Sequence, residues 1–366
     1  MRVPFYDVKA QYDELASEID AAVHGVVSSG GYVLGPEHNA FEREIAEYQG
    51  VRHAIGVANG TDAIRIALDC AGIGPGDEVI TTAFTFVASI ETIVQVGATP
   101  VLVDIEPETF QIDPALIEAA ITERTKAIMP IHLFGQVCDM DAVMAIASRH
   151  GLVVIEDAAQ AIGSSYKGVP AGAFGLVAGV SFYVTKNLGA IGDAGMILTN
   201  DDEMGALAKS YRIHGMGRER YYYDHIGYTS RLDEIQAAFM RPKLRRLDDW
   251  TARRHQIAAN YTEGLANGPV TVPKVAPDVE TTWHQYSVRS PQRDALKTWL
   301  AEDGIDSMIY YPVPLHFHEP YKRFAVPLPE TERAAREILN LPIHPHLSDE
   351  QARAVVERIR AFPPSM

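Results

Sequence analysis

The chain has 366 residues, of which 47% are apolar and 22% charged, a composition typical of globular enzymes. No apolar run approaches the roughly 20 residues that a membrane-spanning helix needs. The N-terminal residues carry charges throughout, without the apolar stretch of a secretory signal. The formal net charge of −16 argues against general nucleic-acid binding, because that requires a basic surface to displace counterions.

Cysteine usage indicates the cellular compartment. Cys70 and Cys138 are the only two cysteines, and neither has a C-x-x-C partner. They therefore predict neither a disulfide framework nor a zinc or iron–sulfur site. We expect a cytoplasmic protein that does not associate with membranes.

Short apolar runs alternate with helix-like segments between residues 55 and 200. Several runs are continuous and rich in valine and isoleucine, as in strands covered on both faces. Residues 139–151 (DMDAVMAIASRHG) have apolar residues at helical spacing and end in glycine, a helix stop signal. This alternation predicts an α/β domain with a largely parallel sheet, whose ligands bind outside the carboxyl ends of the strands. The predicted strands are residues 78–84, 99–105, 126–135, 152–158, 178–184 and 194–200.

The pattern changes near residue 265. A helical stretch over residues 231–265 comes first, and apolar runs and helical patterns of a smaller α+β domain follow it. We therefore predict a large domain over residues 1–250 and a small C-terminal domain over residues 251–366.

The first polar constellation lies in ANGTDAIRIALDCAG, residues 58–72. Gly60 and Thr61 precede a good helix, so free backbone N–H groups and the helix dipole would meet there and could bind an anion. The competing interpretation is a plain helix cap by Thr61 or Asn59.

Asp157 falls at the end of a predicted buried strand, LVVIEDA. A carboxylate at that depth needs a positive or donating partner. It could be a metal ligand, a ribose ligand, the partner of a protonated pyridine nitrogen, or simply the cap of a following helix.

Lys186 lies where a predicted strand runs into the glycine-rich segment SFYVTKNLGAIGDAG, residues 181–195. A lysine at a buried strand end can have its pKa depressed and become a nucleophilic amine. The alternative is a side chain that extends its ammonium group into water. Gly189, Gly192 and Gly195 favour a ligand site, because they permit close backbone approach.

These three features together match the polar groups of pyridoxal 5′-phosphate (PLP). The helix start would bind the phosphate, Asp157 the pyridine nitrogen and Lys186 the aldehyde. Phe86, directly after a predicted strand, offers a ring to stack on the pyridine, although a lone aromatic is more often part of a core.

Other motifs carry less weight. The segment GIGPGD, residues 72–77, departs from G-x-G-x-x-G and reads as a turn. His316 and His318 have a spacing that suits a metal, but no carboxylate cluster accompanies them. The basic run at residues 243–254 is predicted to be a solvated helix face.

The sequence resembles the DegT/DnrJ/EryC1/StrS sugar aminotransferases along nearly its whole length. These are fold-type I PLP enzymes that aminate nucleotide-linked keto sugars. The resemblance implies a large domain with a mostly parallel seven-stranded sheet between helices, and a smaller α+β domain. The stretches that carry it are SSGGYVLGPE, VANGTDAI, PGDEVITTAFTFVAS, ITERTKAIMPIHLFGQ, VIEDAAQAIGSSYKG, SFYVTKNLGAIGDAG, SRLDEIQAA and IYYPVPLHFHEPY.

The resemblance also implies roles for single residues. Lys186 matches the lysine that binds the cofactor aldehyde and acts as general base, and Asp157 matches the partner of the pyridine nitrogen. Gln160 matches a residue on the side of the cofactor's 3′-oxygen, and Phe86 the aromatic over the ring. The phosphate binders correspond to Gly60, Thr61 and Ser181.

In this family a second subunit of a homodimer completes the active site. Tyr228–Arg231 corresponds to the contributed loop, with Arg231 as a candidate contact of the sugar nucleotide. The remaining predicted substrate-binding residues are Tyr32, Tyr310, Tyr311 and His316. One departure concerns cofactor binding: Thr229 stands where the family usually has an asparagine that holds the phosphate across the interface. A threonine hydroxyl is shorter than an amide, which places this contact in question.

The resemblance implies an aminotransferase that takes the amino group from an amino acid, expected to be L-glutamate, and releases 2-oxoglutarate. The acceptor is expected to be a dTDP- or UDP-linked 3-keto sugar. A 4-keto sugar or a cyclitol ketone is the alternative within the family. Two further readings are a PLP-dependent sugar dehydratase, which Lys186 and the isolated cysteines disfavour, and a PLP-binding regulatory protein without turnover.

Overall fold

The computed structural model describes residues 1–363. Its centre is a seven-stranded sheet with the strand order β1-β9-β8-β5-β4-β2-β3. Only β9 runs antiparallel to its neighbours in this sheet, which confirms the prediction of an α/β fold with a mostly parallel sheet. The strands are β1 (His53–Val57), β2 (Glu78–Thr82), β3 (Thr99–Val103), β4 (Thr125–Ile128), β5 (Val153–Asp157), β8 (Val177–Ser181) and β9 (Gly195–Thr199).

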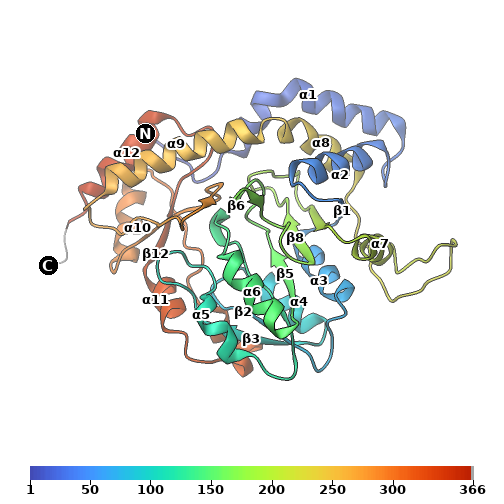
Figure 1. The fold of residues 1–366 in the computed structure, drawn as a ribbon. Helices are drawn as coiled ribbons and strands as arrows, with labels where there is room; N and C mark the ends of the chain where they lie inside the picture. The colour runs from blue at the N-terminus through green and yellow to red at the C-terminus, as the bar shows by residue number, and fades with distance from the viewer. Residues whose placement is uncertain (364–366) are drawn as a thin grey trace.

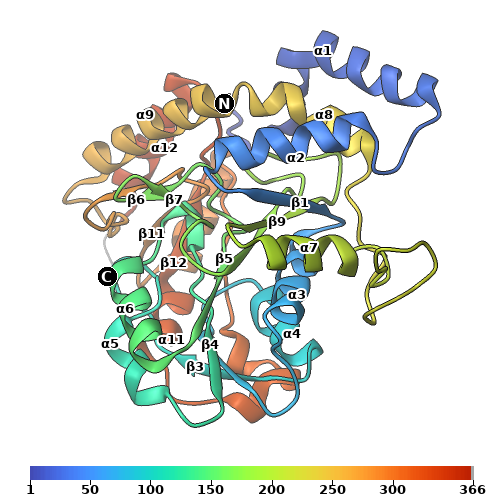
Figure 2. The same cartoon turned by 45° about the vertical axis from the view of Figure 1, so that its right-hand side comes forward.

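Helices cover both faces of this sheet (Figures 1 and 2). One face packs against α2 (Pro36–Tyr48), α6 (Met140–His150) and α8 (Glu234–Leu244). The opposite face packs against α3 (Gly60–Cys70), α4 (Ala88–Gln95) and α7 (Asp202–Tyr211). The predicted helix over residues 139–151 is confirmed as α6, which ends at Gly151 with a left-handed φ of 63°. No helix within residues 1–363 has the length and apolar character to cross a membrane.

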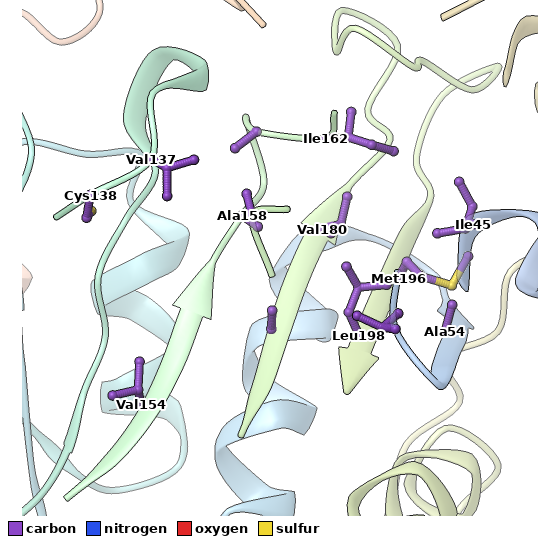
Figure 3. Close-up of a cluster of buried hydrophobic side chains, with 14 of the residues drawn as sticks. Ile45, Ala54, Val137, Cys138, Val154, Ala158, Ile162, Val180, Met196 and Leu198 are labelled. Atoms are coloured by element: carbon purple, nitrogen blue, oxygen red, sulfur yellow. The ribbon is translucent and has the colours of Figure 1, made fainter. Parts of the chain in front are cut away.

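The alternation of side chains along the strands supplies both faces of the core. Ala54, Met196 and Leu198 point to the face of α2, where they meet Ile45 (Figure 3). Their sequence neighbours Ile55 and Ile197 belong instead to the cluster on the α3 face. Strands buried on both faces in this way read as continuous apolar runs.

A second hydrophobic core lies in the C-terminal part of the chain. It is built from α9 (Leu247–Leu265), β11 (Tyr286–Arg289), α10 (Arg293–Glu302), β12 (Ile338–Leu341) and α12 (Asp349–Arg360), and Val3 of the N-terminal segment joins it. The predicted second domain extends to residue 366, beyond the last described residue.

The remaining elements are short, except for α1. The list is α1 (Val8–Ser29), α5 (Pro114–Ile117), η1 (Glu118–Ala120), η2 (Leu133–Gly135), β6 (Ser165–Tyr166), β7 (Val169–Pro170), β10 (Val279–Glu280), η3 (Leu315–Phe317), η4 (Glu319–Phe324) and α11 (Pro329–Glu337).

The helical stretch predicted over residues 231–265 forms two helices, α8 and α9, and α8 ends at Leu244, two residues after the buried Pro242. One expectation for this stretch needs correction. The basic run at residues 243–254 is not solvated throughout, since Lys243 and Arg254 are each only 3% exposed. Backbone carbonyl oxygens accept hydrogen bonds from both buried cations, which allows them to leave water.

Candidate active site

A cavity of about 1020 Å³ opens at the edge of the sheet where the parallel strands β2, β5 and β8 end. Ligands of parallel sheets bind at this edge. Nine of the predicted site residues line the cavity, although they are spread over some 250 residues of sequence. They are Gly60, Thr61, Phe86, Asp157, Gln160, Ser181, Lys186, Tyr310 and Tyr311.

Lys186 lies in a tight loop that follows β8. Its backbone N–H donates to the carbonyl of Tyr183 at 2.7 Å. A Cβ atom on Gly189 would lie 2.3 Å from the carbonyl oxygen of Val184, so only glycine permits this turn. Burial lowers the pKa of the Lys186 amine to about 8, and the negative charge of Asp157 partly opposes the shift. An uncharged, nucleophilic amine is therefore accessible near neutral pH.

Asp157 is the last residue of β5, and its carboxylate is buried. The Ser89 hydroxyl donates to Oδ2 at 2.7 Å, and the Ala159 N–H donates to Oδ1 at 3.1 Å. Burial raises the pKa of Asp157, while these hydrogen bonds and the Lys186 charge oppose the rise. The hydrogen bonds favour the ionised carboxylate, which is the form that pairs with a cationic ring nitrogen.

The N-terminus of α3 faces the cavity beside Ser181. Asn59 caps the helix by accepting from the Asp62 N–H at 2.7 Å. The N–H groups of Gly60 and Thr61 have no acceptor within residues 1–363. A Cβ atom on Gly60 would lie 2.6 Å from Cβ of Ser181, so glycine allows the helix start to approach this hydroxyl group. Free amides, a helix dipole and a hydroxyl group together suit a phosphate group.

Gln160, Tyr311 and Phe86 form one wall of the cavity. The Gln160 Oε1 atom accepts from the backbone N–H of Phe134 at 2.8 Å, and its Nε2 donates to the Tyr311 hydroxyl at 3.3 Å. Phe86 is 54% exposed, so its ring is available to a ligand rather than part of a core. The Phe86 and Tyr311 ring centroids lie 6.3 Å apart.

Four predicted site residues do not line the cavity of a single chain. Tyr32 is 54% exposed, and Thr229 hydrogen-bonds His214 at 3.0 Å on the surface. Arg231 lies near Thr229 outside the cavity. His316, contrary to expectation, is 1% exposed and lies 3.8 Å from Glu332. His318, which directly follows the short helix η3, lines the cavity instead.

Several cavity residues were not predicted from the sequence. Tyr6 comes from the N-terminal segment, and His284 and Gln285 directly precede β11. The sequence gives these residues no motif of their own. Ser89, whose hydroxyl contacts Asp157 behind the cavity, was not predicted either, although it lies in the family-like stretch PGDEVITTAFTFVAS and in the first turn of α4.

The residues present fit PLP. The unpartnered amides at α3 suit the phosphate group, the buried and hydrogen-bonded Asp157 suits a pyridinium nitrogen, and the amine of Lys186 suits the aldehyde. All three groups face one cavity, which is large enough for a cofactor and a substrate together.

Comparison with known proteins agrees with this geometry. Residues 13–360 match the DegT/DnrJ/EryC1/StrS aminotransferase family. A curated relative from Geobacillus stearothermophilus, called a pleiotropic regulatory protein, is 50% identical over 99% of both chains. A second relative, the dTDP-3-amino-3,4,6-trideoxy-alpha-D-glucose transaminase of Streptomyces venezuelae, is 47% identical over 99% of this chain and 96% of its own.

The fold is also that of solved structures. The crystal structure of DesV from S. venezuelae, in complex with a ketimine intermediate, superposes with a TM-score of 0.96. It is 46% identical, and the match covers 99% of this chain and 98% of the other. The chain is thus a PLP-dependent transaminase and belongs to the DegT/DnrJ/EryC1/StrS aminotransferase family.

Proposed function

We propose that the enzyme transfers an amino group from L-glutamate to a nucleotide-linked keto sugar. The observation that carries the proposal is the single cavity that joins the Lys186 amine, the Asp157 carboxylate and the open N-terminus of α3. The names of relatives support the substrate class, because the S. venezuelae relative is a dTDP-amino-sugar transaminase.

Five residues of the cavity have a task in this reaction. When bound, PLP supplies an aldehyde that carries the amino group and a ring that stabilises negative charge on the substrate carbon. Asp157 holds the ring nitrogen in its protonated state, and the amides of Gly60 and Thr61 with Ser181 hold the phosphate. The Lys186 amine, with its pKa lowered to about 8, takes and returns the substrate proton.

The preferred acceptor is a dTDP- or UDP-linked 3-keto sugar. The proposal rests on the sequence resemblance and on the 3-amino position in the name of the S. venezuelae relative. A 4-keto sugar or a cyclitol ketone remains the alternative within the family. An NMR assignment of the aminated carbon, after incubation of nucleotide keto sugars with L-glutamate, decides between them.

We further infer a homodimer in which each subunit completes the other's site. The segment between α7 and α8 projects from the molecule in both ribbon views (Figures 1 and 2). It carries exposed apolar side chains, with Tyr221 69% and Ile226 96% exposed. A second subunit would cover these side chains and would receive Thr229, Arg231 and Tyr32 at its own cavity. A cytoplasmic location and a domain division at residue 250 complete the proposal.

Adding L-glutamate alone to the holoenzyme tests the function. Transamination predicts the release of 2-oxoglutarate in an amount equal to the enzyme sites, with loss of the absorbance of Lys186-bound cofactor. The alternative is a PLP-binding regulator, which the name of the G. stearothermophilus relative suggests. An unchanged spectrum and no 2-oxoglutarate would favour that alternative.

A further inference from the structure

Five polar side chains form a continuous chain of contacts along the cavity, from the residue after Lys186 to Tyr310. Asn187 Oδ1 lies 3.2 Å from His284 Nδ1, and His284 Nε2 lies 3.4 Å from Gln285 Nε2. Gln285 Nε2 lies 3.0 Å from the Tyr6 hydroxyl, which in turn lies 3.1 Å from the Tyr310 hydroxyl. Three of the members, Asn187, His284 and Gln285, are at most 5% exposed.

A backbone carbonyl fixes the direction of the first hydrogen bonds. Asn187 Nδ2 lies 3.0 Å from the carbonyl oxygen of Thr282, which can only accept. The Asn187 amide group must therefore donate there, and its Oδ1 must accept from His284. It follows that His284 carries its proton on Nδ1.

His284 is neutral, so its Nε2 is an acceptor. Burial holds the pKa of His284 well below its usual value, and the positive charges of Lys186 and Arg254 lower it further. Gln285 must then turn its amide nitrogen toward His284, although this leaves Gln285 Oε1 buried without a partner. The opposite orientation would place Oε1 against the lone pair of His284, which is repulsive.

The amide nitrogen of Gln285 also fixes the direction in which the hydroxyl groups of Tyr6 and Tyr310 donate. Because Gln285 donates to Tyr6, the Tyr6 proton is free to point at Tyr310. Within residues 1–363 the Tyr6 hydroxyl has no hydrogen-bond acceptor other than Tyr310, so Tyr310 accepts that bond and its own proton remains for the cavity that its side chain lines. We propose that Gln285 and Tyr6 are positioning residues that make Tyr310 an obligatory hydrogen-bond donor to a substrate oxygen.

The recognised group is an oxygen acceptor, either a carboxylate oxygen of the amino donor or an oxygen of the sugar. This inference rests on the proposed function, in which both substrates use the cavity in turn. A donor locked in direction favours a ligand with an acceptor at that position and disfavours one that presents a proton.

Replacing Gln285 with glutamate tests the direction of the chain. A carboxylate in place of the amide accepts the proton of the Tyr6 hydroxyl. Tyr310 must then donate to Tyr6, so it can donate to substrate only by giving up its hydrogen bond with Tyr6. We expect Gln285→Glu and Tyr310→Phe each to lower kcat/KM about 10- to 100-fold for one of the two half-reactions. The half-reaction affected, with L-glutamate or with the keto sugar, identifies the source of the oxygen.

A double variant distinguishes a change of hydrogen-bond direction from an effect of the new negative charge at position 285. In Tyr6→Phe combined with Gln285→Glu, no hydroxyl group links residue 285 to Tyr310, so Tyr310 can donate to substrate again. We expect this variant to recover to within about threefold of Tyr6→Phe alone. If it stays as impaired as Gln285→Glu, or if Gln285→Glu itself changes neither half-reaction, the proposal is wrong.

A binding measurement makes the test independent of turnover. We also expect the same ranking of variants in a dissociation constant, measured with dTDP-glucose and with α-methyl-L-glutamate, neither of which can complete transamination. The ranking should appear for the one ligand whose oxygen Tyr310 recognises, and the other ligand should bind all variants alike. Tyr286→Phe is the matched control, since Tyr286 is the next residue along and bonds Thr262 outside the cavity. A wild type that binds but does not release 2-oxoglutarate would refute the proposed function, while the ranking would still decide on Tyr310.

Discussion

At the scale of single residues, the site depends on an amine that burial keeps partly uncharged. Lys186 is the only cavity group assigned to proton transfer, and burial lowers its pKa to about 8. We predict that Lys186→Ala lowers kcat about 1,000-fold or more, because it removes the amine that both bonds the cofactor aldehyde and transfers the substrate proton. Release of 2-oxoglutarate from L-glutamate is the measurement, and the exposed Lys209→Ala is the control. Normal turnover in Lys186→Ala would contradict the assignment.

Ser89 acts on the cofactor site through Asp157. Its hydroxyl donates to the buried carboxylate at 2.7 Å and so stabilises the ionised form. Ser89→Ala removes that bond, so the pKa of Asp157, which burial already raises, should rise further. We predict about tenfold weaker PLP binding, and a loss of binding on acidification that begins at higher pH than in the wild type.

Fluorescence titration of the cofactor-free protein with PLP at several pH values measures both effects. Ser89→Thr retains a hydroxyl group and should bind PLP as the wild type does. Equal pH profiles of PLP binding for Ser89→Ala and the wild type would show that the Ser89 hydrogen bond does not control the pKa of Asp157.

At the scale of elements, α8 holds the loop that carries Lys186. Gln236 exchanges hydrogen bonds with the backbone of Ile191 at 2.9 and 3.1 Å, and the Lys243 ammonium donates to the carbonyl of Gly189. Lys243 has no carboxylate partner within residues 1–363, and burial lowers its pKa to about 8. The loop is thus fixed by a buried cation that is costly to keep.

This cost predicts a pH dependence of stability. The folded pKa of Lys243 lies below its unfolded value near 10.5, so its penalty is fully present below pH 8 and disappears as the pH rises toward 10.5. Relative to Lys243→Met, the wild type should gain roughly 2–3 kcal/mol of unfolding free energy over that range. Denaturant unfolding at pH 7.5 and pH 10 measures the change, with Lys209→Met as the exposed control. If the difference in unfolding free energy between the wild type and Lys243→Met is the same at both pH values, the prediction is wrong.

Elements with strong local patterns could be predicted from the sequence, and elements set by distant partners could not. The six predicted strands correspond to β2, β3, β4, β5, β8 and β9. Strand β1 was missed, because its place in the sheet depends on antiparallel pairing with β9, about 140 residues away, and on packing against both faces of the sheet. The helical stretch over residues 231–265 was predicted, but the break between α8 and α9 was not.

At the scale of the whole molecule, the site contains residues that local sequence patterns predict and residues that only the folded chain brings to the cavity. Lys186, Asp157 and the start of α3 each carry a local signal, and the parallel sheet brings them together. Tyr6 and Gln285 carry none, since their hydrogen bond joins residues 279 positions apart. His316 is the opposite case: its segment resembles a family pattern, but its side chain is buried away from the cavity.

The proposed homodimer leads to a test by subunit mixing. If Arg231 serves the partner's cavity, Lys186→Ala and Arg231→Ala are each inactive alone but complementary together. A mixed dimer has one intact site, with Lys186 from one subunit and Arg231 from the other. Random exchange of equal amounts should therefore restore about one quarter of wild-type activity, because half of the dimers are mixed and each has one working site of two. The recovery is measured as multiple-turnover release of 2-oxoglutarate after refolding the mixture, with L-glutamate and the nucleotide keto sugar both present. No recovery, with exchange verified by differently tagged subunits, would show that Arg231 does not serve the partner's cavity. The exposed apolar side chains between α7 and α8 would then have to be explained without a shared active site.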